Sequence, residues 1–309
     1  MRTLKSGFIS FLSLLLILSF LLCSCSLPKP QDPSKSDPGV SVGAFDPEAI
    51  LAAVPAFTDK AFVNVNDGKP FFTESDYTTE AFERYAELDS LGRCGITYAN
   101  VCKELMPTEE RGNIGSVKPS GWHTVKYDIV DGKYLYNRCH LIGYQLTGEN
   151  ANRQNLITGT RYLNIQGMLP YENMVADYVK ETGNHVLYRS TPLFDGDELV
   201  ARGVLLEGYS VEDGGEGISF CVYCYNNQPG ITIDYATGES RLEGDTAQTP
   251  STGETEESIT YILNVAGKKF HLPTCPSVGA MKEENRQTYT GTREDLIEDG
   301  YSPCGSCKP

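Results

Sequence analysis

Runs of apolar, β-branched and aromatic residues follow one another along the second half of the chain, and residues 218–226 alternate with the period of a β-strand. Four such runs predict strands, at residues 185–194, 198–211, 218–226 and 231–235. Further upstream, residues 128–137 predict a hairpin that turns at Asp131–Gly132, since an Asp-Gly pair between apolar runs is a strong turn signal. Residues 155–160 predict one more short strand.

Three segments instead have the spacing of a helix. Residues 46–54 predict a short helix, with Asp46 able to cap it and Pro47 in its first turn. Residues 79–91 have a rough apolar face at helical period, and residues 160–183 predict a long helix interrupted near Pro170. Strand signals around one long central helix predict an α+β domain with an antiparallel sheet, which ends near residue 238.

The ends of the chain differ in composition from this domain. Residues 1–25 begin with Arg2 and Lys5 and continue as an apolar run, which indicates an export signal. Leu22-Cys23-Ser24-Cys25 resembles a bacterial lipobox with Cys25 as the lipid-modified residue; the alternative is an ordinary secretory signal. Residues 26–55, rich in Pro and Ser at their start, predict a flexible stalk. No other stretch is apolar enough to cross a bilayer.

Beyond the domain, residues 239–257 have almost no apolar side chains and predict a disordered linker. Residues 258–309 then form a small second module. A module of this size rarely holds itself together with an apolar core alone, so we expect a disulfide or a metal ion in it.

Charge is distributed unevenly between these regions. The net charge of −15 would argue against a nucleic-acid partner, because two polyanions repel each other. However, residues 111–164 contain seven Lys or Arg against three acids, a local charge of +4. Residues 165–260 contain 17 acids against four bases, a local charge of −13. The predicted hairpin and the start of the long helix are therefore the basic part of the protein.

This basic part contains side chains that suit phosphodiester hydrolysis. His140 titrates near neutrality and can act as a general base, and the planar Arg138 guanidinium can grip phosphate oxygens. Mg²⁺ needs only one or two protein oxygens, because it keeps most of its water ligands. Asn164 lies near the start of the long helix, where it can face the hairpin. Glu172 lies eight residues further along, and Asn155 nine residues before Asn164.

These residues carry a resemblance to a known family. Asn137-Arg138-Cys139-His140 resembles the D-R-G-H motif of the DNA/RNA non-specific endonucleases of the ββα-metal superfamily, in particular the secreted DNases and DNA-entry nucleases of Gram-positive bacteria. The resemblance covers about residues 57–238 and includes the stretches at 106–128 and 155–164. Two positions depart from the motif, with Asn137 in place of Asp and Cys139 in place of Gly.

The resemblance implies a role for each of these side chains. His140 would be the general base, Asn164 the direct Mg²⁺ ligand and Glu172 a partner of the metal's water shell. Asn155 would orient the site, and Arg138 would act in catalysis by contacting phosphate. Further basic residues could line the substrate groove, namely Lys118, Arg161, Arg111 and Arg189. Glu149 is a rival carboxylate to Glu172, and His123 and His185 are expected to be structural.

Five cysteines lie inside the predicted nuclease domain. Cys221 and Cys224 form a C-x-x-C pair on a predicted strand, where residues three apart face opposite sides, so we expect two packed thiols rather than a chelate. Cys139 is expected to pack beside His140. The pairing of Cys94 with Cys102 stays open, because an exported protein permits a disulfide.

The last four candidate ligands belong to the small module. His271-x3-Cys275 is followed after 28 residues by Cys304-x2-Cys307, which suits a closed tetrahedral Zn²⁺ site. The frame resembles the zinc-binding domain of the adaptive-response DNA alkyl-repair protein, in which all four ligands are Cys and one accepts a methyl group. Because the first ligand here is His271, only a structural zinc is expected. A disulfide from Cys275 to Cys304 or Cys307 is the alternative.

The sequence thus predicts a Mg²⁺-dependent endonuclease that cleaves DNA, with RNA as a further substrate. It predicts a lipoprotein on the outer face of the cell membrane, with free secretion as the alternative. A surface receptor that binds nucleic acid without cutting it is the alternative function, and the departures at Asn137 and Cys139 are its support.

Overall fold

The computed structural model describes residue 40, residues 43–244 and residues 259–309 except for 292, 294–295 and 297–300. The predicted signal peptide, the lipid-modified Cys25 and most of the predicted linker lie outside the described residues. Within the described part of the chain, no helix combines the length and the apolarity needed to cross a bilayer.

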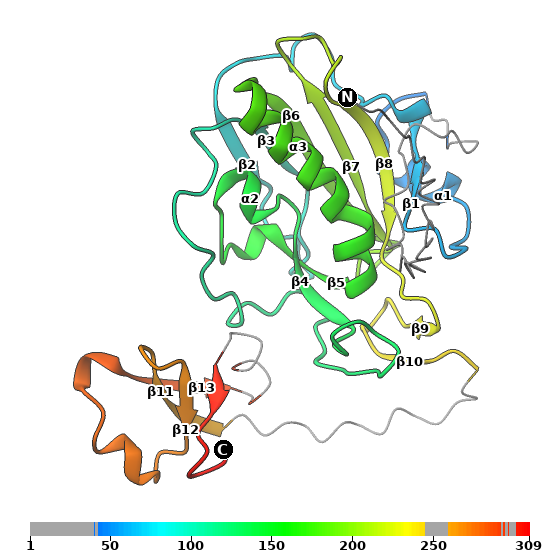
Figure 1. Cartoon of the computed structure of the whole chain (residues 1–309). Coiled ribbons are helices and arrows are strands. Elements are labelled where there is room, and N and C mark those ends of the chain that lie inside the picture. The colour runs from blue at the N-terminus through cyan, green and yellow to red at the C-terminus, as the bar shows by residue number, and fades with distance from the viewer. Residues whose placement is uncertain (1–39, 41–42, 245–258, 292, 294–295, 297–300) are drawn as a thin grey trace, which may run out of the picture. The chain divides into compact units, whose positions relative to one another are not determined.

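The centre of the larger domain is a six-stranded antiparallel sheet in the order β1-β8-β7-β6-β3-β2 (Figure 1). Its strands are β1 (Phe62–Asn64), β2 (Phe82–Tyr85), β3 (Thr97–Val101), β6 (Val186–Leu193), β7 (Gly203–Ser210) and β8 (Ser219–Tyr225). Strands β6, β7 and β8 confirm three of the strands predicted in the second half of the chain, and nearly all of their residues are buried because both faces of the sheet are covered. Two further ribbons are β4 (Tyr136–His140) with β5 (Leu156–Thr160) and β9 (Ile231–Ile233) with β10 (Ser240–Leu242).

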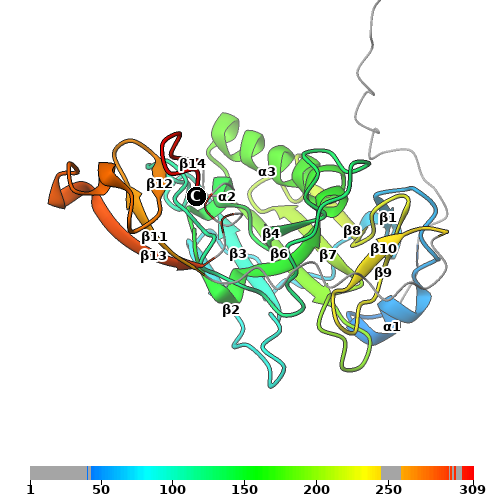
Figure 2. The ribbon, with the colours of Figure 1, turned by 90° about the horizontal axis from the view of Figure 1, so that it is seen from below.

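Helices cover the two faces of this sheet differently. The helices are α1 (Pro47–Ala53), α2 (Tyr144–Thr147) and α3 (Leu169–Thr182), with a π-helical turn at Leu163–Met168 and short 3-10 turns at Asn66–Gly68 and Arg153–Asn155. Helix α3 lies along one face of the sheet, and α1 lies on the opposite side (Figures 1 and 2). The fold is therefore α+β, as the sequence predicts.

Each face of the sheet has its own apolar core. On the α3 side, the core includes Val175 and Val179 of the helix with Cys224 of β8. On the other side, Ile50 of α1 packs with Val40 and with Cys221 of β8. Strand β8 therefore points Cys221 and Cys224 to opposite faces, and both thiols are free and buried, as the period of a strand requires.

The domain extends beyond its predicted bounds at both ends. Asp46 caps α1, with its side chain accepting hydrogen bonds from the amides of Glu48 and Ala49, so part of the predicted stalk is ordered against the sheet. At the other end, β10 pairs with β9, which places Ser240–Leu242 in the domain rather than in the linker.

Two sequence expectations are corrected by the observed elements. The predicted helix at 79–91 is wrong, since this segment contains β2, which pairs with β3. The hairpin at 128–137 does turn where predicted, with Gly132 and Lys133 both at positive φ. Its second arm first pairs with the chain before the turn, through an antiparallel bridge between Lys126 and Tyr134, and then continues into β4, which pairs with β5.

The C-terminal module has a small sheet of its own, in the order β13-β11-β12-β14. Its strands are β11 (Ile259–Asn264), β12 (Lys269–His271), β13 (Arg286–Gly291) and β14 (Ser302–Pro303), with 3-10 turns at Pro276–Val278 and Glu283–Asn285. Its apolar core is small, built around Tyr261, Leu263 and Phe270. This agrees with the expectation that the module needs a further stabilising element.

Candidate active site and metal centre

Strands β4 and β5 and the helical segment after them carry most of the predicted site residues. Arg138 and His140 lie on β4, and Asn155 immediately precedes β5. Asn164 lies in the π-helical turn that leads into α3, where the amide of Leu169 donates to the carbonyl of Asn164. Such turns widen a helix by one residue and are frequent at functional sites.

A groove opens beside these elements. In the larger domain it is lined by residues 111–115, Tyr134, Tyr136, Asn137, Arg138, Arg161 and Asn164. Its polar side chains are mostly arginines and asparagines, so an anionic ligand meets cations and amide groups there.

His140 is buried at the end of β4, with 6% of its surface exposed. Its Nε2 lies 2.7 Å from the carbonyl oxygen of Asn150, and its Nδ1 lies 3.2 Å from Nη2 of Arg111. Burial, and then the charge of Arg111, lower the pKa of His140 to about 4. The imidazole is therefore neutral at physiological pH and has the protonation state of a base.

Asn155 holds the chain that follows β4. Its buried side chain accepts from the amide of Ile142 at 2.8 Å and donates to the carbonyl of Ile142 at 3.0 Å. This pair of bonds mimics a strand contact and fixes the turn from β4 to α2.

Asn164 faces the hairpin, and its Nδ2 donates to Oδ1 of Asn137 at 3.3 Å. Asn137 is one of the two departures from the D-R-G-H pattern. Because it accepts from the amide nitrogen of Asn164, it leaves the amide oxygen of Asn164 available for a ligand. A neutral oxygen donor of this kind suits a hard cation such as Mg²⁺.

Cys139, the second departure, packs against a glycine. It is fully buried on β4, and burial raises the pKa of its thiol far above the usual range, which excludes a thiolate nucleophile. A Cβ placed at Gly159 on β5 would lie only 2.3 Å from the Cys139 sulfur. The sulfur therefore fills the space that Gly159 leaves open.

Glu172 lies buried in the first turn of α3. A Cβ at Gly143 would come within 2.7 Å of its carboxylate, so glycine is required where the turn after β4 approaches it. Burial raises the pKa of Glu172 to about 7, and Arg111 opposes that shift. The rival carboxylate Glu149 is half-buried, and burial also raises its pKa.

Arg138 lines the groove but is held by its own loop. Its Nε and Nη2 donate to the carbonyls of Val117 and Gly115, at 2.7 and 2.9 Å, and its guanidinium stacks on Trp122. These contacts fix residues 115–117, of which Gly115 lines the groove. Contact between Arg138 and phosphate stays a prediction.

The other candidate cations differ in whether they line the groove. Arg161 lines the groove and pairs with Asp131 at 3.0 Å. Lys118 is exposed and is not one of the groove-lining residues in the described part of the chain. The expectation that Arg189 lines the groove is wrong, since Arg189 is paired with buried Glu207 and stacked on Phe45 and Phe72.

His123 and His185 have the structural roles that we expect for them. Nε2 of His123 lies 3.0 Å from the carbonyl of Thr237, and Nδ1 of His185 lies 2.6 Å from Glu212. Cys94 and Cys102 are both free thiols, and Cys94 donates to the carbonyls of Arg153 and Leu156. Sequence reasoning missed the contacts that Arg111 and Asn150 make with His140, and no motif in the sequence marks them.

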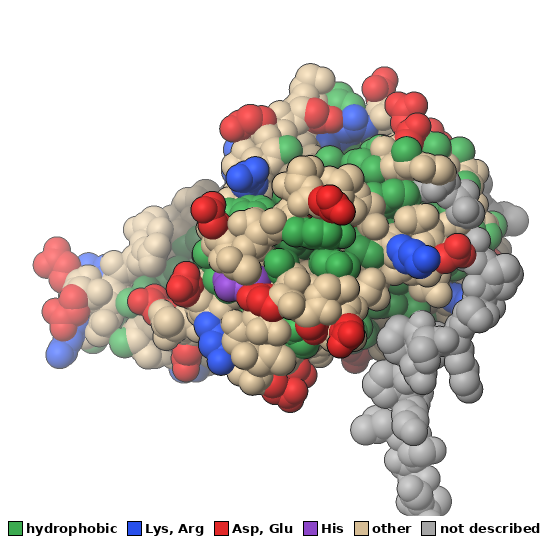
Figure 3. All heavy atoms as spheres, turned by 90° about the horizontal axis from the view of Figure 1, so that it is seen from above, with side chains coloured by type: hydrophobic (Ala, Val, Ile, Leu, Met, Phe, Trp, Pro, Cys, Tyr) green, Lys and Arg blue, Asp and Glu red, His purple; other side chains and the backbone are tan. Residues whose placement is uncertain are grey.

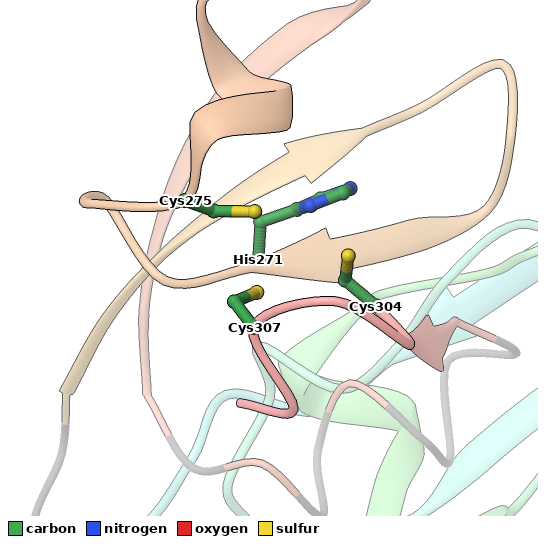
Figure 4. A group of neighbouring side chains, drawn as sticks. All are labelled: His271, Cys275, Cys304 and Cys307. Carbon is green, nitrogen blue, oxygen red and sulfur yellow. The ribbon is translucent and has the colours of Figure 1, made fainter.

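The module contains a second cluster of ligands. His271, Cys275, Cys304 and Cys307 point toward one another (Figure 4), and their ligand atoms all lie within 4.8 Å of one another. His271 comes from β12, whereas Cys304 and Cys307 come from the turn after β14. The three thiols are free of disulfides, which argues against the alternative of a Cys275 bridge.

The chemistry of this cluster fits a tetrahedral metal ion. Nδ1 of His271 is buried without a hydrogen-bond partner, and the amide of Ser306 donates to the sulfur of Cys304 at 3.4 Å. Backbone amides lower the pKa of Cys304, as expected for a thiolate ligand in a knuckle turn. An orphaned imidazole nitrogen among three thiols is the donor set that Zn²⁺ prefers.

The fold and the first site define a class of protein. A hairpin with a histidine on its first strand, followed by a helix with an asparagine facing that strand, is the ββα arrangement of metal-dependent nucleases. Residues 73–211 match the model of the DNA/RNA non-specific endonuclease family.

Individual relatives agree with this assignment. A curated deoxyribonuclease from Streptococcus dysgalactiae subsp. equisimilis is 32% identical over 136 residues, which cover 41% of this chain and 40% of the relative. The chain thus spans less than half the length of that curated relative. The structure of NucA from Streptococcus agalactiae with magnesium bound is 26% identical, with a TM-score of 0.53, covering 59% of this chain and 88% of NucA. Its metal-free structure is 27% identical, with a TM-score of 0.54, covering 62% and 92%.

Proposed function

We propose that this protein is a Mg²⁺-dependent endonuclease that hydrolyses phosphodiester bonds in DNA, with RNA as a second substrate. The observation that carries the proposal is the groove beside β4, where Arg138, Asn164 and Arg161 line the wall and a neutral imidazole lies directly behind Arg111. The 32% identity to a curated deoxyribonuclease and the likeness to magnesium-bound NucA support it.

In this proposal, His140 takes the proton from the attacking water. Nε2 carries hydrogen and donates to the Asn150 carbonyl, which keeps the lone pair on Nδ1 and fixes the ring. The water oxygen bonds to phosphorus, its proton passes to Nδ1, and the bond from phosphorus to the 3′ oxygen breaks. The 3′ oxygen leaves and is protonated, so the products have 5′-phosphate ends, as the family resemblance implies.

The remaining residues orient the substrate and the metal. Asn164 would hold Mg²⁺ through its amide oxygen, and Glu172 would bind the water shell of the ion. When bound, the ion supplies positive charge to the phosphate and the leaving oxygen. Asn155 would keep the turn after β4 in register, and Arg161, Arg138 and Lys118 would contact phosphates without reading bases, which gives little sequence preference.

The module and the leader complete the proposal. His271, Cys275, Cys304 and Cys307 would hold a structural Zn²⁺ that replaces the large apolar core the module lacks. Residues 1–25 would export the chain, and lipidation at Cys25 would tether the nuclease to the outer face of the membrane, with free secretion as the alternative.

The test is plasmid degradation by the purified mature protein with Mg²⁺ and with EDTA. His140→Ala should lower the cleavage rate by roughly a hundredfold or more, since general bases contribute factors of that size. Asn164→Ala should also lower the rate strongly, because it removes the proposed Mg²⁺ ligand. His123→Ala is the matched control and should cleave at the wild-type rate, because His123 contacts Thr237 and not the groove. Full cleavage by His140→Ala protein would refute the mechanism.

The alternative function is a surface receptor that binds nucleic acid without cutting it. Its support, the departures at Asn137 and Cys139, is weakened because Asn137 bonds to Asn164 and Cys139 fits over Gly159. A receptor would retard DNA in a gel and leave it intact with Mg²⁺, so the same assay separates the two functions.

A further inference from the structure

Both ring nitrogens of His140 are engaged in this structure. Arg111 has no acceptor atom, so its Nη2 donates to Nδ1 of His140 across 3.2 Å. Nε2 then carries the hydrogen and donates to the carbonyl of Asn150 across 2.7 Å. The lone pair that a general base needs is therefore already used by Arg111.

Arg111 also separates the base from the groove. Arg111 is exposed and lines the groove, whereas His140 is buried and is not one of the lining residues in the described part of the chain. A water molecule in the groove thus meets the guanidinium before it can reach the imidazole.

The loop that carries Arg111 is held to the site by a few polar contacts. The side chain of Asn150 donates to the carbonyl of Asn113 at 3.4 Å, and the hydroxyl of Tyr144 donates to the carbonyl of Glu109 at 2.8 Å. A Cβ at Gly112 would lie 2.7 Å from Nδ2 of Asn150, so an alanine there would force either the Asn150 side chain or the loop to shift. Asn150 therefore holds the imidazole with its carbonyl and the Arg111 loop with its side chain.

A substrate phosphate is a stronger partner for Arg111 than a neutral imidazole is. Guanidinium and phosphate form charge-assisted, often bidentate hydrogen bonds, roughly twice as strong as bonds between neutral groups. The loop around Arg111 contains no helix or strand and is largely exposed, so a displacement of the side chain breaks few contacts.

We propose that Arg111 is a catalytic residue with two positions, capping Nδ1 of His140 in the free protein and binding the substrate phosphodiester when it enters the groove. Binding of the phosphate thereby uncovers the base, and a water molecule meets an active imidazole only when a substrate is present. This inference rests on the proposed function, because it takes His140 as the general base. Asn150 and Gly112 are positioning residues in it, since they act through Arg111 and His140.

The experiment follows His140 directly in metal-free protein with EDTA. ¹⁵N-labelled histidine gives its pKa by NMR, with His140→Ala identifying the resonance, and diethyl pyrocarbonate measures how fast the free ring nitrogen is modified. Arg111→Gln should raise the pKa of His140 by about one unit, because the positive charge beside the ring is lost. It should also speed modification roughly tenfold, since a hydrogen bond to a charged donor is lost. Arg161→Gln removes another groove cation and should change neither value.

A short DNA duplex then serves as the probe of displacement. In EDTA it should raise the pKa of His140 in wild-type protein and raise it less in Arg111→Gln protein, where the cap is already gone. Gly112→Ala keeps every polar group and should speed modification by pushing the loop off Asn150. Two results would overturn the proposal that Arg111 caps His140. In one, the pKa and the modification rate of His140 are unchanged in folded Arg111→Gln protein. In the other, DNA shifts the pKa of His140 equally in both proteins.

These measurements separate this inference from the proposed function. If wild-type protein does not cleave plasmid with Mg²⁺, the proposed function fails whatever the state of the ring. If wild-type protein cleaves plasmid but Arg111→Gln changes neither the pKa nor the modification rate of His140, only the proposed capping by Arg111 fails.

Discussion

At the scale of single residues, the site combines a neutral imidazole with a buried carboxylic acid. His140 and Glu172 have pKa values near 4 and near 7, so burial shifts them in opposite directions, as expected when the charged form is disfavoured in each case. Arg111 influences both, lowering the pKa of His140 and opposing the rise at Glu172. One cation, Arg111, therefore acts on two of the groups proposed for catalysis.

The raised pKa of Glu172 predicts a pH-dependent stability in metal-free protein. The folded state binds the proton more tightly than the unfolded state, whose pKa is near 4.5. The contribution of the neutral acid is complete below about pH 4.5 and is lost as the pH rises through 7. Glu172→Gln has no proton to lose, so relative to wild type it should gain on the order of 3 kcal/mol between pH 4.5 and pH 8.

Urea unfolding in EDTA at several pH values measures this difference. Glu149→Gln is the matched control, because Glu149 is only half-buried and its advantage at high pH should be clearly smaller. Parallel stability profiles for wild type and Glu172→Gln would contradict the assignment of a buried, protonated Glu172.

At the scale of elements, the strands and helix that carry the site were predictable, and their partners were not. The alternation in 218–226 and the helical period after residue 160 depend on neighbouring residues, so the sequence reveals β8 and α3 directly. The segment 79–91 was misassigned because its apolar spacing fits a helix locally, whereas pairing with β3 decides its structure. Long-range pairing leaves no local period, so β1 and β3 also escaped prediction.

Inside the site, too, local patterns were predictable from the sequence and long-range contacts were not. The interruption predicted near Pro170 is instead a start, since Pro170 occupies the first turn of α3 and the π-helical turn precedes it. Proline lacks an amide hydrogen and fits a first turn without cost. His140, Asn155, Asn164 and Glu172 were predictable because their spacing resembles a family. The contact of Arg111 with His140 depends on a loop whose path the sequence does not encode locally.

The pairing of β4 with β5 yields a prediction at this scale. Gly159→Ala would place a Cβ 2.3 Å from the sulfur of Cys139, which overpacks the ribbon that carries His140. We expect a loss of about 1–3 kcal/mol in the free energy of unfolding, the usual range for overpacking. Cys139→Gly, which restores the glycine of the family motif, should relieve the clash in the double variant.

A double-mutant cycle by urea unfolding measures this coupling. Destabilisations that simply add in Cys139→Gly/Gly159→Ala would mean that sulfur and glycine do not compete for the same space. Cys139→Gly alone should retain Mg²⁺-dependent cleavage, because the buried thiol is not a nucleophile in the proposed reaction.

At the scale of the whole molecule, the acidic surface and the arginines of the groove occupy different places. Acidic side chains are spread over the face seen in Figure 3, in keeping with the net charge of −15. The groove beside β4 instead contains Arg111, Arg138 and Arg161. In the proposed function, the acidic surface elsewhere would repel DNA from the rest of the protein and restrict productive contacts to the groove.

The two structured parts also differ in what stabilises them, which gives a prediction for metal removal. The larger domain has apolar cores on both faces of its sheet, whereas the module has a small core and the His271–Cys307 cluster. Cys304→Ser in the full chain should abolish stoichiometric zinc, measured by native mass spectrometry, and make residues 259–309 sensitive to proteolysis. Cleavage of plasmid with Mg²⁺ should persist, because the proposed catalytic residues all lie between residues 111 and 172. Ser306→Ala, beside the ligand, is the matched control and should keep its zinc. Two outcomes would show that the cluster does not hold the module folded. In one, Cys304→Ser protein still binds one zinc ion tightly; in the other, its module resists protease as the wild-type module does.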